Sequence, residues 1–555
     1  MSYVLRQPYG FLVLIVLFQM ILYVSAICFT DQSVGFVFDD YFLVVQSYEK
    51  LQLSEIWFQD LWASDHSNSG FYRPVFVSSI WIDQHLFGLH AFGYRLHNVI
   101  WYILCTWILV LLLSQYHRSY AWLATLLITL HPMLSEGVCW IAARNDMQCV
   151  FFIVLSMYWY TLFGYKDDKN QFVYKQYLWS LPCVLGLLSK ETAISLVCVL
   201  LISFCSKKQW KQLIVLLCLL VGWWWWRIAL GIHTPSLSMD ILQDGMEYGL
   251  LIAVDVGSRL VVPWRLSPAT GFHWLEVVWW QVGLCVINIS LFVWGWRRIL
   301  GASQKEYTWL YMAIISALLP FPSILYTGVY GDRYWILSIV ALGIFCLQHI
   351  PANTLSRHQT WSWVIIVVWS GIIWNRVPHW NSDTEFWEQE ERQFSTPYSQ
   401  VSLAHMYYNQ KRYGEAMRLY YQSYVHEIPY LYGCASFLDA VLKTEGSQSM
   451  QTAYLWVTQK GCPVNGEMKG LLAVSYVQTA MWTELQTLLQ EDIKDPTKRL
   501  DLAYMAWDVY QQDLEHFCEL YAQWQQQNTL RPQLNTITQS TMSQEIDVAI
   551  EVCLR

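Results

Sequence analysis

The run "FLVLIVLFQMILYVSAICF" spans residues 11–29 and holds no charged side chain. A run of 19 predominantly apolar residues in helical conformation is long enough to cross the hydrocarbon core of a bilayer. Arg6 precedes the run and no convincing small-residue cleavage site follows it, so we expect a retained anchor rather than a signal peptide. Hydrophobic residues make up 55% of the 555 residues and charged residues only 14%. This composition favours a polytopic membrane protein with a polar appendage.

Further apolar runs continue to Asn375, and no obvious one follows. Together with the first run, they predict about 11 spans. The further expected spans are 98–114, 119–131, 147–164, 177–190, 191–206, 212–230, 276–295, 307–321, 334–350 and 361–375.

Basic residues sort the loops between these spans. Lys and Arg gather in alternate loops, at 118, 166–175, 207–211, 297–305 and 357, which places these loops and the N-terminus in the cytoplasm. The stretch 244–263 carries Asp255 and Arg259 and would break the alternation as a span, so we expect an interfacial or re-entrant element there. The loop after the first span and the C-terminal region then share the non-cytoplasmic side.

From residue 376 the sequence becomes polar and helical. Residues 403–423, "LAHMYYNQKRYGEAMRLYYQS", have the spacing of a tetratricopeptide (TPR) repeat, and Lys411 stands where glycine is usual. Segments near 471–489 and 500–520 resemble degenerate repeats. A helical hairpin without repeat ancestry is the alternative. We expect a TPR-like domain over 376–525 and a polar tail over 526–555.

Charge and cysteine usage exclude two classes. The net charge of −8 provides no basic footprint for nucleic acid. The 14 cysteines are scattered singly, without a CxxC motif or zinc spacing, so we expect small buried apolar side chains rather than a disulfide framework or metal ligands.

The loop after the first span begins "SVGFVFDDYFLVV" (33–45), with adjacent carboxylates at Asp39 and Asp40. Ionisable groups at a membrane boundary are costly and tend to be functional. Neighbouring side chains of an extended segment point in opposite directions, so only one of the two can face a given substrate atom. The alternative is that Asp40 caps a helix beginning near Tyr41.

Four other polar clusters fall on the same expected side. Each could be a structural ion pair, such as Lys190 with Glu191, but four clusters on one face favour a site. The candidate residues are Arg73, His97, Asn98, His131, Glu136, Arg144, Asn145, Asp146, Lys190, Glu191, Asp332 and Arg333.

Carboxylates and cations at a lipid surface suit transfer of a sugar from a polyprenyl phosphate to a hydroxyl. Such a reaction needs a carboxylate base beside the attacking oxygen and Arg or Lys beside the leaving phosphate. Asp39 or Asp40 would be the base, with Asp39 preferred, and Arg73, Arg144, Lys190 and Arg333 are candidate phosphate partners. A divalent ion is left open, because two carboxylates with His97 or His131 would suit one, although no ligand set with recognisable spacing is present.

An ordered set of motifs makes a resemblance specific. "FDD" (38–40), "YRP" (72–74) with "FGYRLHN" (92–98), "HPMLSEGVCWIAARND" (131–146), "LLSKET" (187–192) and "GDRYW" (331–335) resemble GT-C glycosyltransferases. The set is most similar to the transmembrane-and-TPR O-mannosyltransferase group and its bacterial relatives, and "NRVPHWNSDTEFWEQ" (375–389) is similar to the connector before their repeats. The resemblance covers roughly residues 10–425.

The resemblance implies an all-α fold, with a GT-C-like catalytic domain over 1–375 ahead of the repeats. It implies that the acidic pair carries the base and that the 131–146 and 187–192 segments line the donor site. A membrane glycosyltransferase with a polyprenyl-phosphate-linked sugar as donor and a protein as acceptor is the leading hypothesis. We expect a bacterial inner membrane with the catalytic loops in the periplasm, or the endoplasmic reticulum membrane with the loops in the lumen. The sugar is not readable from these residues. Alternatives are transfer to a glycolipid or envelope polysaccharide, a transporter of lipid-linked sugar, and a non-enzymatic TPR scaffold.

Overall fold

The structure is a computed structural model of the protein. The described residues are 8–28, 34–61, 70–116, 120–164, 173–232, 239–263, 265–267, 270–271, 279–286, 308–321, 324, 329–349, 357–425, 433–464, 466–479, 481, 484 and 487–488. Packing divides the chain into two compact units, Met1–Phe394 and Ser395–Arg555. This division falls after the expected boundary at residue 375, because helix α18 packs with η9, the 3₁₀ turn that continues α17, and so stays with the first unit.

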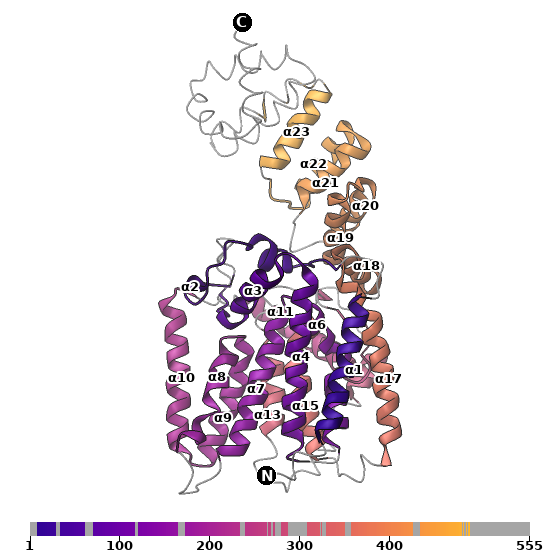
Figure 1. Cartoon of the computed structure of the whole chain (residues 1–555). Coiled ribbons are helices and arrows are strands. Elements are labelled where there is room, and N and C mark those ends of the chain that lie inside the picture. Colours follow the sequence, from indigo (N-terminus) through magenta and orange to yellow (C-terminus); the bar gives the residue numbers. More distant parts are fainter. Residues whose placement is uncertain are drawn as a thin grey trace. The chain divides into compact units, whose positions relative to one another are not determined.

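The first unit is built from helices, several of which run roughly parallel (Figure 1). Its α-helices are α1 (Pro8–Cys28), α2 (Leu53–Ile56), α3 (Pro74–Phe87), α4 (Ala91–Leu113), α5 (Ala121–Thr129), α6 (Ser135–Cys139), α7 (Arg144–Phe163), α8 (Ser180–Leu187), α9 (Ile194–Ser206), α10 (Trp210–Ala229), α11 (Met239–Val261), α13 (Thr308–Leu318), α15 (Ile336–His349), α17 (Gln359–Arg376) and α18 (Asp383–Phe394). Short helical turns are η1 (Tyr41–Gln46), η3 (Pro132–Leu134), η4 (Val173–Tyr177), η5 (Glu191–Ala193), η8 (Asp332–Trp335) and η9 (Val377–Trp380). Two-residue strands β1 (Thr270–Gly271) and β2 (Val329–Tyr330) pair antiparallel.

The expected spans coincide with helices wherever the structure describes them. The span at 276–295 lies largely outside the described residues, which cover only 279–286 of it. Within the described part, α4, α7 and α10 are long and apolar enough to cross a membrane, and α5 with the bent η3–α6 segment would make a fourth span. The protein therefore has the helical character that was predicted, while the count of about 11 spans stays a prediction.

Helix α11 covers most of the stretch 244–263, for which an interfacial or re-entrant element is expected. Among the described helices, α11 is not one of those long and apolar enough to cross a membrane, so its interfacial placement stays a prediction. Asp255 and Arg259, one turn apart on this helix, form a buried ion pair with 2.6 Å between Oδ2 and Nη2. The two charges that argued against a regular apolar span therefore neutralise each other on the same helix face.

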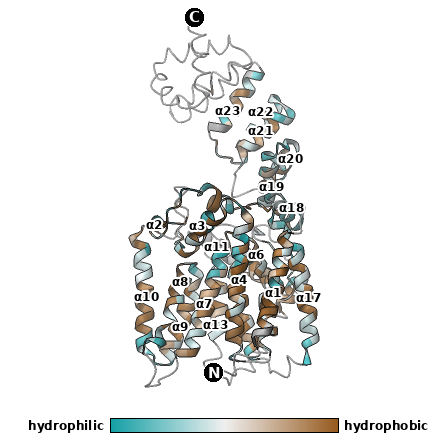
Figure 2. Cartoon of the chain, viewed as in Figure 1, coloured by the Kyte–Doolittle hydropathy of each residue, from teal (hydrophilic) through white to brown (hydrophobic). Residues whose placement is uncertain are grey.

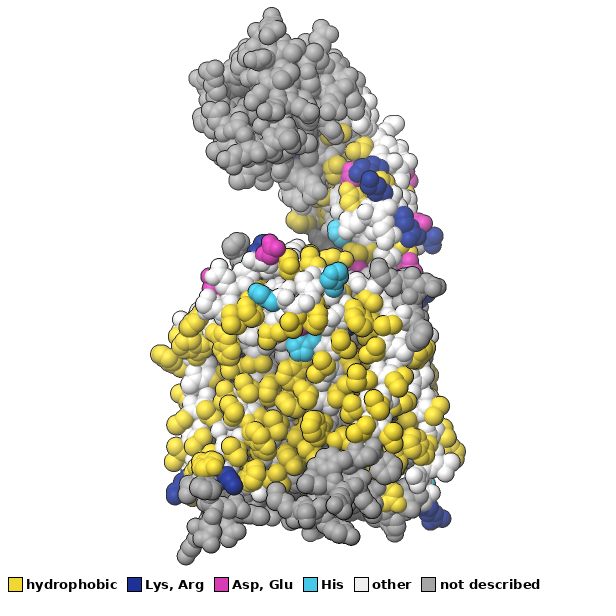
Figure 3. Space-filling view, viewed as in Figure 1, with side chains coloured by type: hydrophobic (Ala, Val, Ile, Leu, Met, Phe, Trp, Pro, Cys, Tyr) yellow, Lys and Arg dark blue, Asp and Glu magenta, His cyan; other side chains and the backbone are white. Residues whose placement is uncertain are grey.

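Polar residues gather where helices begin or end. Helix α7 starts with Arg144, Asn145 and Asp146 and then continues as an apolar run, and Lys190 and Glu191 stand between α8 and α9. Apolar residues dominate the parallel helices and spread over the visible face of this unit (Figures 2 and 3). Because apolar surface cannot satisfy charged groups, this arrangement confines the chemistry to the helix ends.

The second unit is a row of antiparallel helix pairs whose neighbours pack in sequence. Its helices are α19 (Pro397–Asn409), α20 (Tyr413–Val425), α21 (Cys434–Glu445), α22 (Ser447–Gln459) and α23 (Gly466–Gln478). Four of the expected repeat residues, Leu403, Ala404, Ala416 and Tyr420, are buried, as TPR packing positions would be. The expected repeat at 500–520 lies outside the described residues.

A disulfide joins Cys434 at the start of α21 to Cys462 just after α22. This finding corrects the expectation that the cysteines serve only as small apolar side chains. The two cysteines are 28 positions apart and belong to no recognisable sequence motif. The helix hairpin between them brings their Cα atoms to a distance of 6.4 Å.

Lys411 occupies the turn between α19 and α20 with a φ of 62°, in the left-handed region. A side chain with a Cβ atom is strained there, whereas glycine adopts this conformation freely. The position that departs from the repeat pattern is therefore also the position where the backbone favours glycine.

We expect Lys411→Gly to stabilise this helix pair by about 1 kcal/mol, which slows local opening roughly fivefold. Hydrogen–deuterium exchange of the full-length protein over residues 397–425 measures this opening. The control is Gln410→Gly, since Gln410 has an ordinary φ of −83° and glycine there adds only flexibility. Faster exchange in Lys411→Gly would contradict the prediction.

Candidate active site

The acidic loop turns sharply at Phe38, whose φ of 54° is unusual for a bulky side chain. Its N–H donates to Oδ1 of Asp383 at 3.0 Å, and its ring stacks on Trp140 and meets Trp387 edge-on, with centroids 5.5 and 5.3 Å away. Such strain persists only where surrounding contacts impose it, and it often marks a functional position. Here it fixes the direction of the carboxylate that follows.

Asp40 is fully buried, and both of its oxygens accept backbone hydrogen bonds. Oδ2 accepts from the N–H of Val37 at 3.2 Å, and Oδ1 accepts from the N–H of Ala142 at 2.9 Å. Asp40 precedes η1, yet its side chain does not cap that turn, so the helix-cap alternative does not describe its contacts. Burial raises the pKa of Asp40 to about 7, while Arg95 and the two N–H groups act in the opposite direction.

Asp39 is half-buried, and its carboxylate accepts no hydrogen bond from any residue that the structure describes. Loss of water around the carboxylate raises its pKa to about 6; the Arg333 guanidinium opposes this rise and the Asp383 carboxylate adds to it. An unbonded carboxylate with a pKa near neutrality is suited to accept a proton. The two adjacent acids therefore occupy opposite environments.

Arg333 is held by Glu136 and is close enough to Asp39 to oppose the rise in its pKa. Its Nη1 donates to Oε1 of Glu136 at 2.7 Å, and its backbone N–H donates to Oε2 at 3.0 Å. The guanidinium also stacks over the rings of Trp140 and Tyr334, 4.4 and 4.7 Å from their centroids. With 15% of its side chain exposed, Arg333 combines a fixed position with access to a ligand.

Lys190 and Asp146 extend the cluster. Lys190 donates to Oδ1 of Asp146 at 2.5 Å and lies 5.4 Å from the centroid of Tyr334, so Tyr334 stands between the two cations. Oδ2 of Asp146 and Oδ1 of Asn145 are buried without a hydrogen-bond partner in the described residues. Buried polar atoms are normally satisfied, so these two oxygens are unusual features of the cluster.

Asp332 anchors the segment that carries Arg333. Its carboxylate is fully buried, accepts from Arg259 at 3.1 Å and from Arg376 at 2.9 Å, and so joins α11 and α17 to η8. These contacts use both oxygens of the carboxylate. Asp332 is therefore placed to hold the fold around Arg333.

Arg144, His97 and Asn98 form a separate buried group. Arg144 donates to Asn98 at 2.6 Å, to Asp83 at 2.5 Å and to two further oxygens, and its side chain has no exposure. His97 bonds Asp83 at 2.6 Å. These contacts join α3, α4 and α7, and they leave Arg144 without access to a phosphate.

Arg73 pairs with Glu191 in a third group, with 2.8 Å between Nη2 and Oε2. The pairing of Lys190 with Glu191 considered from the sequence does not occur, because these neighbours point to different partners, Asp146 and Arg73.

His131 is buried, bonds the carbonyl of Leu260 at 3.2 Å and packs against Trp369. Among the described residues, no group of three or more His, Cys, Asp or Glu side chains is arranged to hold a metal ion. His97 and His131 therefore do not join the acidic pair in such a group.

Sequence reasoning missed Asp383, which contacts the acidic loop from 345 positions away. It also left Arg95 out of the site, although Arg95 bonds Gly35 and Asn381 and so ties the acidic loop to the segment before α18. The motif "NSDTEFW" (381–387) carried a signal, since acidic side chains in a connector after a membrane helix are plausible partners for a loop at the same boundary.

The fold and the site define a multi-span helical membrane protein with a charged site at the ends of its helices. The expected resemblance to the transmembrane-and-TPR O-mannosyltransferase group is confirmed by sequence comparison. The chain is 27% identical over 206 residues to Protein O-mannosyl-transferase TMTC4 of Mus musculus. This alignment covers 32% of this chain and 27% of that protein. The chain is 25% identical over 204 residues to the Homo sapiens protein of that name, covering 31% and 27%.

The chain thus aligns with 27% of the length of each of these relatives. No family model matches it. Among solved structures, the crystal structure of ArnT from Cupriavidus metallidurans in the apo state matches 85% of this chain and 79% of its own, with 14% identity and a TM-score of 0.36. The relatives and the apolar helices indicate an integral membrane protein.

We expect the two adjacent acids to differ in what they contribute to stability. In Asp40→Asn the amide can accept from only one of the two N–H groups and turns its NH₂ toward the other, at a cost of about 1–3 kcal/mol. Asp39→Asn removes a desolvated charge without breaking a hydrogen bond, so it should be neutral or stabilising. Thermal melting of the detergent-solubilised protein measures both, and equal losses in the two variants would contradict the assignment.

Proposed function

We propose that this protein is a GT-C-type membrane glycosyltransferase that moves a sugar from a polyprenyl-phosphate donor to a hydroxyl group of a protein. The observation that carries the proposal is the unbonded carboxylate of Asp39 beside Arg333. The partial sequence similarity to proteins named O-mannosyl-transferases supports the reaction class and favours a protein acceptor.

The chemistry is a single inverting displacement. Asp39 takes the proton of the acceptor hydroxyl as its oxygen forms a bond to the anomeric carbon. The bond from that carbon to the phosphate oxygen breaks, and its electron pair leaves with the polyprenyl phosphate. Arg333 and Lys190 stabilise the negative charge on the departing phosphate.

Asp40, Asp332 and Arg144 support the site as positioning residues. Asp40 holds the loop on Ala142, Asp332 holds the segment of Arg333, and Arg144 ties the starts of α4 and α7 together. Asp383 holds the strained backbone of Phe38 and raises the pKa of Asp39. This division leaves Asp39 and Arg333 partly exposed.

The site faces the non-cytoplasmic side, periplasmic in a bacterial inner membrane or lumenal in the endoplasmic reticulum. The distribution of Lys and Arg among the loops supports this orientation. The disulfide Cys434–Cys462 supports it independently, because disulfides persist in oxidising compartments. The TPR-like unit would then meet protein acceptors on that side, as repeat surfaces commonly bind proteins.

Purified full-length protein should transfer sugar from one member of a panel of polyprenyl-phosphate mannose, hexosamine and pentose donors to a secreted protein acceptor. We expect Asp39→Asn to lower turnover by about 10²–10⁴-fold, since it removes the base. The matched control is Glu55→Gln, an exposed carboxylate later in the same loop, which should keep full activity. Mass spectrometry of the acceptor gives the readout.

Undiminished turnover in Asp39→Asn would remove Asp39 from the mechanism. Transfer to a glycolipid but to no protein would move the acceptor to the envelope alternative. Absence of transfer from every donor, in a protein that melts normally, would overturn the proposal in favour of a scaffold or transporter.

We also expect the rate to depend on pH through Asp39. The base works only when deprotonated, so kcat/KM should rise with pH through an inflection near the Asp39 pKa of about 6 and then level off. Asp383→Asn removes a neighbouring negative charge, so it should lower that pKa and move the inflection to lower pH. Asn keeps an oxygen to accept from Phe38, and the loop therefore stays in place.

Rate profiles between about pH 5 and pH 8 for the wild type, Asp383→Asn and Glu55→Gln test this prediction. A merely structural role of Asp383 would change the height of the profile and not the position of its inflection. An inflection that stays in place in Asp383→Asn would contradict the proposed coupling of the two carboxylates.

A further inference from the structure

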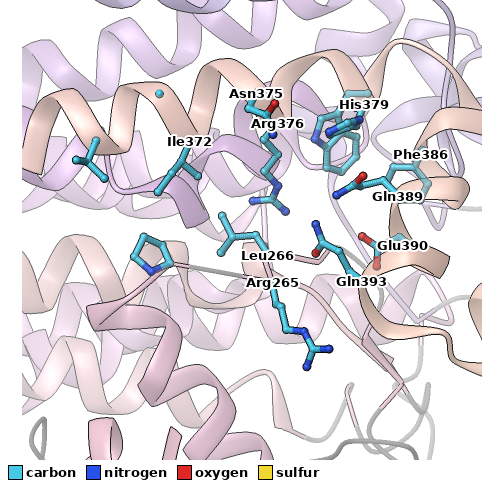
Figure 4. Close-up of a pocket in the computed structure, with 14 residues that line it drawn as sticks. Arg265, Leu266, Ile372, Asn375, Arg376, His379, Phe386, Gln389, Glu390 and Gln393 are labelled. Carbon is cyan, nitrogen blue, oxygen red and sulfur yellow. The ribbon is translucent and has the colours of Figure 1, made fainter. Parts of the chain in front are cut away.

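A cavity of about 500 Å³ lies between α17, η9, α18 and the segment that carries Pro263, Arg265 and Leu266 (Figure 4). This volume is in the range of small-molecule sites. Side chains of Leu266, Arg376, Gln389 and Gln393 converge on it from different segments. None of the charged residues proposed from the sequence for sugar transfer lines it, so the cavity is a second feature of the first unit.

One wall of the cavity changes character along α17. Val368, Ile372, Arg376 and His379 are spaced by three or four residues, so they follow one face that continues into η9. The face is apolar at Val368 and Ile372 and cationic at Arg376. Gly371 lies on the same wall, and a Cβ atom added there would meet nothing within 4 Å. The cavity therefore has an apolar end and a polar end, with room beside Gly371.

The apolar end opens toward a surface suited to lipid. Helix α17 exposes large apolar side chains, among them Trp361 at 68%, Val367 at 68% and Val368 at 54%. A contiguous apolar surface of this kind marks a contact with membrane or with a partner. Since Val368 belongs both to this surface and to the cavity wall, an acyl or isoprenoid chain can pass from the bilayer into the cavity.

The polar end is suited to a phosphate. Arg376 and Arg265 supply guanidinium groups, which are preferred partners of phosphate oxygens. Gln389 and Gln393 also line this end, and their amide NH₂ groups are hydrogen-bond donors. Glu390 is buried, and this burial raises its pKa to about 8, which weakens its negative charge near pH 7, while its Oε2 accepts a hydrogen bond from Ser267.

We propose that this cavity binds one lipid with a phosphate head group, whose tail follows Val368 and Ile372 and whose phosphate meets Arg376 and Arg265. The lipid is either a bilayer phospholipid or a polyprenyl phosphate, which share this chemistry. The proposal does not depend on the proposed sugar transfer, and its test measures binding alone.

A chain of stacked aromatic rings lies between the cavity and the residue that precedes Asp39. Trp380 lines the cavity and stacks on Trp140 at 5.8 Å, and Trp140 stacks on Phe38, the residue before Asp39. Arg376 at the polar end bonds Asp332, the neighbour of Arg333. A bound lipid would therefore stiffen the support of the acidic loop without occupying the place of the substrate.

Native mass spectrometry of the full-length protein, with phosphatidylglycerol, polyprenyl phosphate, inorganic phosphate and diacylglycerol as separate probes, tests the proposal. We expect one phosphate-bearing lipid to bind, and we expect Gly371→Leu, which fills the cavity, to weaken that binding at least about tenfold. The matched control is Gly222→Leu on α10, where a Cβ also meets nothing within 4 Å. It should bind as the wild type does.

Arg265→Glu provides a second variant, because Arg265 is exposed and its charge reversal leaves the cavity wall intact. Weaker binding of the phosphate-bearing lipid in this variant supports the proposal even if Gly371→Leu fails to fold. Preference for polyprenyl phosphate would identify a carrier-lipid site, and preference for phosphatidylglycerol a site for bilayer lipid. Equal binding of diacylglycerol, binding of inorganic phosphate as tightly as of either lipid, or unchanged affinity in both variants would overturn the proposal.

Discussion

The buried carboxylate of Asp332 is the contact on which the rest of the site depends. It accepts from Arg259 on α11 and from Arg376 at the end of α17, and it has no exposure. Removing one partner of such a buried group leaves an uncompensated charge, which is strongly destabilising. Because Arg333 follows Asp332 directly, the same contacts determine where the cation beside Asp39 lies. Asp332 therefore stabilises the fold, and the next residue, Arg333, belongs to the candidate site.

In two pairs of adjacent charged residues, the two neighbours contact different partners. Asp40 is buried on backbone N–H groups while Asp39 remains unbonded, and Lys190 pairs with Asp146 while Glu191 pairs with Arg73. In both pairs, neighbouring side chains point in different directions and meet different environments. Few polar residues are present at the ends of membrane helices. Each short polar segment therefore both stabilises the fold and carries a residue of the candidate site.

The charged site and the cavity of the first unit share one residue. Arg376 bonds the Asp332 carboxylate on one side and lines the lipid-sized cavity on the other. The rings of Trp380, Trp140 and Phe38 stack between the cavity and the acidic loop.

Apolar run length and polar punctuation determined much of this protein from the sequence alone. These signals are local, so they predicted the helices, the polar helix ends and the repeat-like spacing around Lys411. Only the tertiary structure decided which charges pair, because partners such as Phe38 and Asp383 lie 345 positions apart. It likewise decided that Arg144 is enclosed, that Cys434 meets Cys462, and that α17 and α18 enclose a cavity. The physical reason is that a hydrogen bond or an ion pair depends on distances of a few ångströms between folded segments, and residue type alone does not encode them.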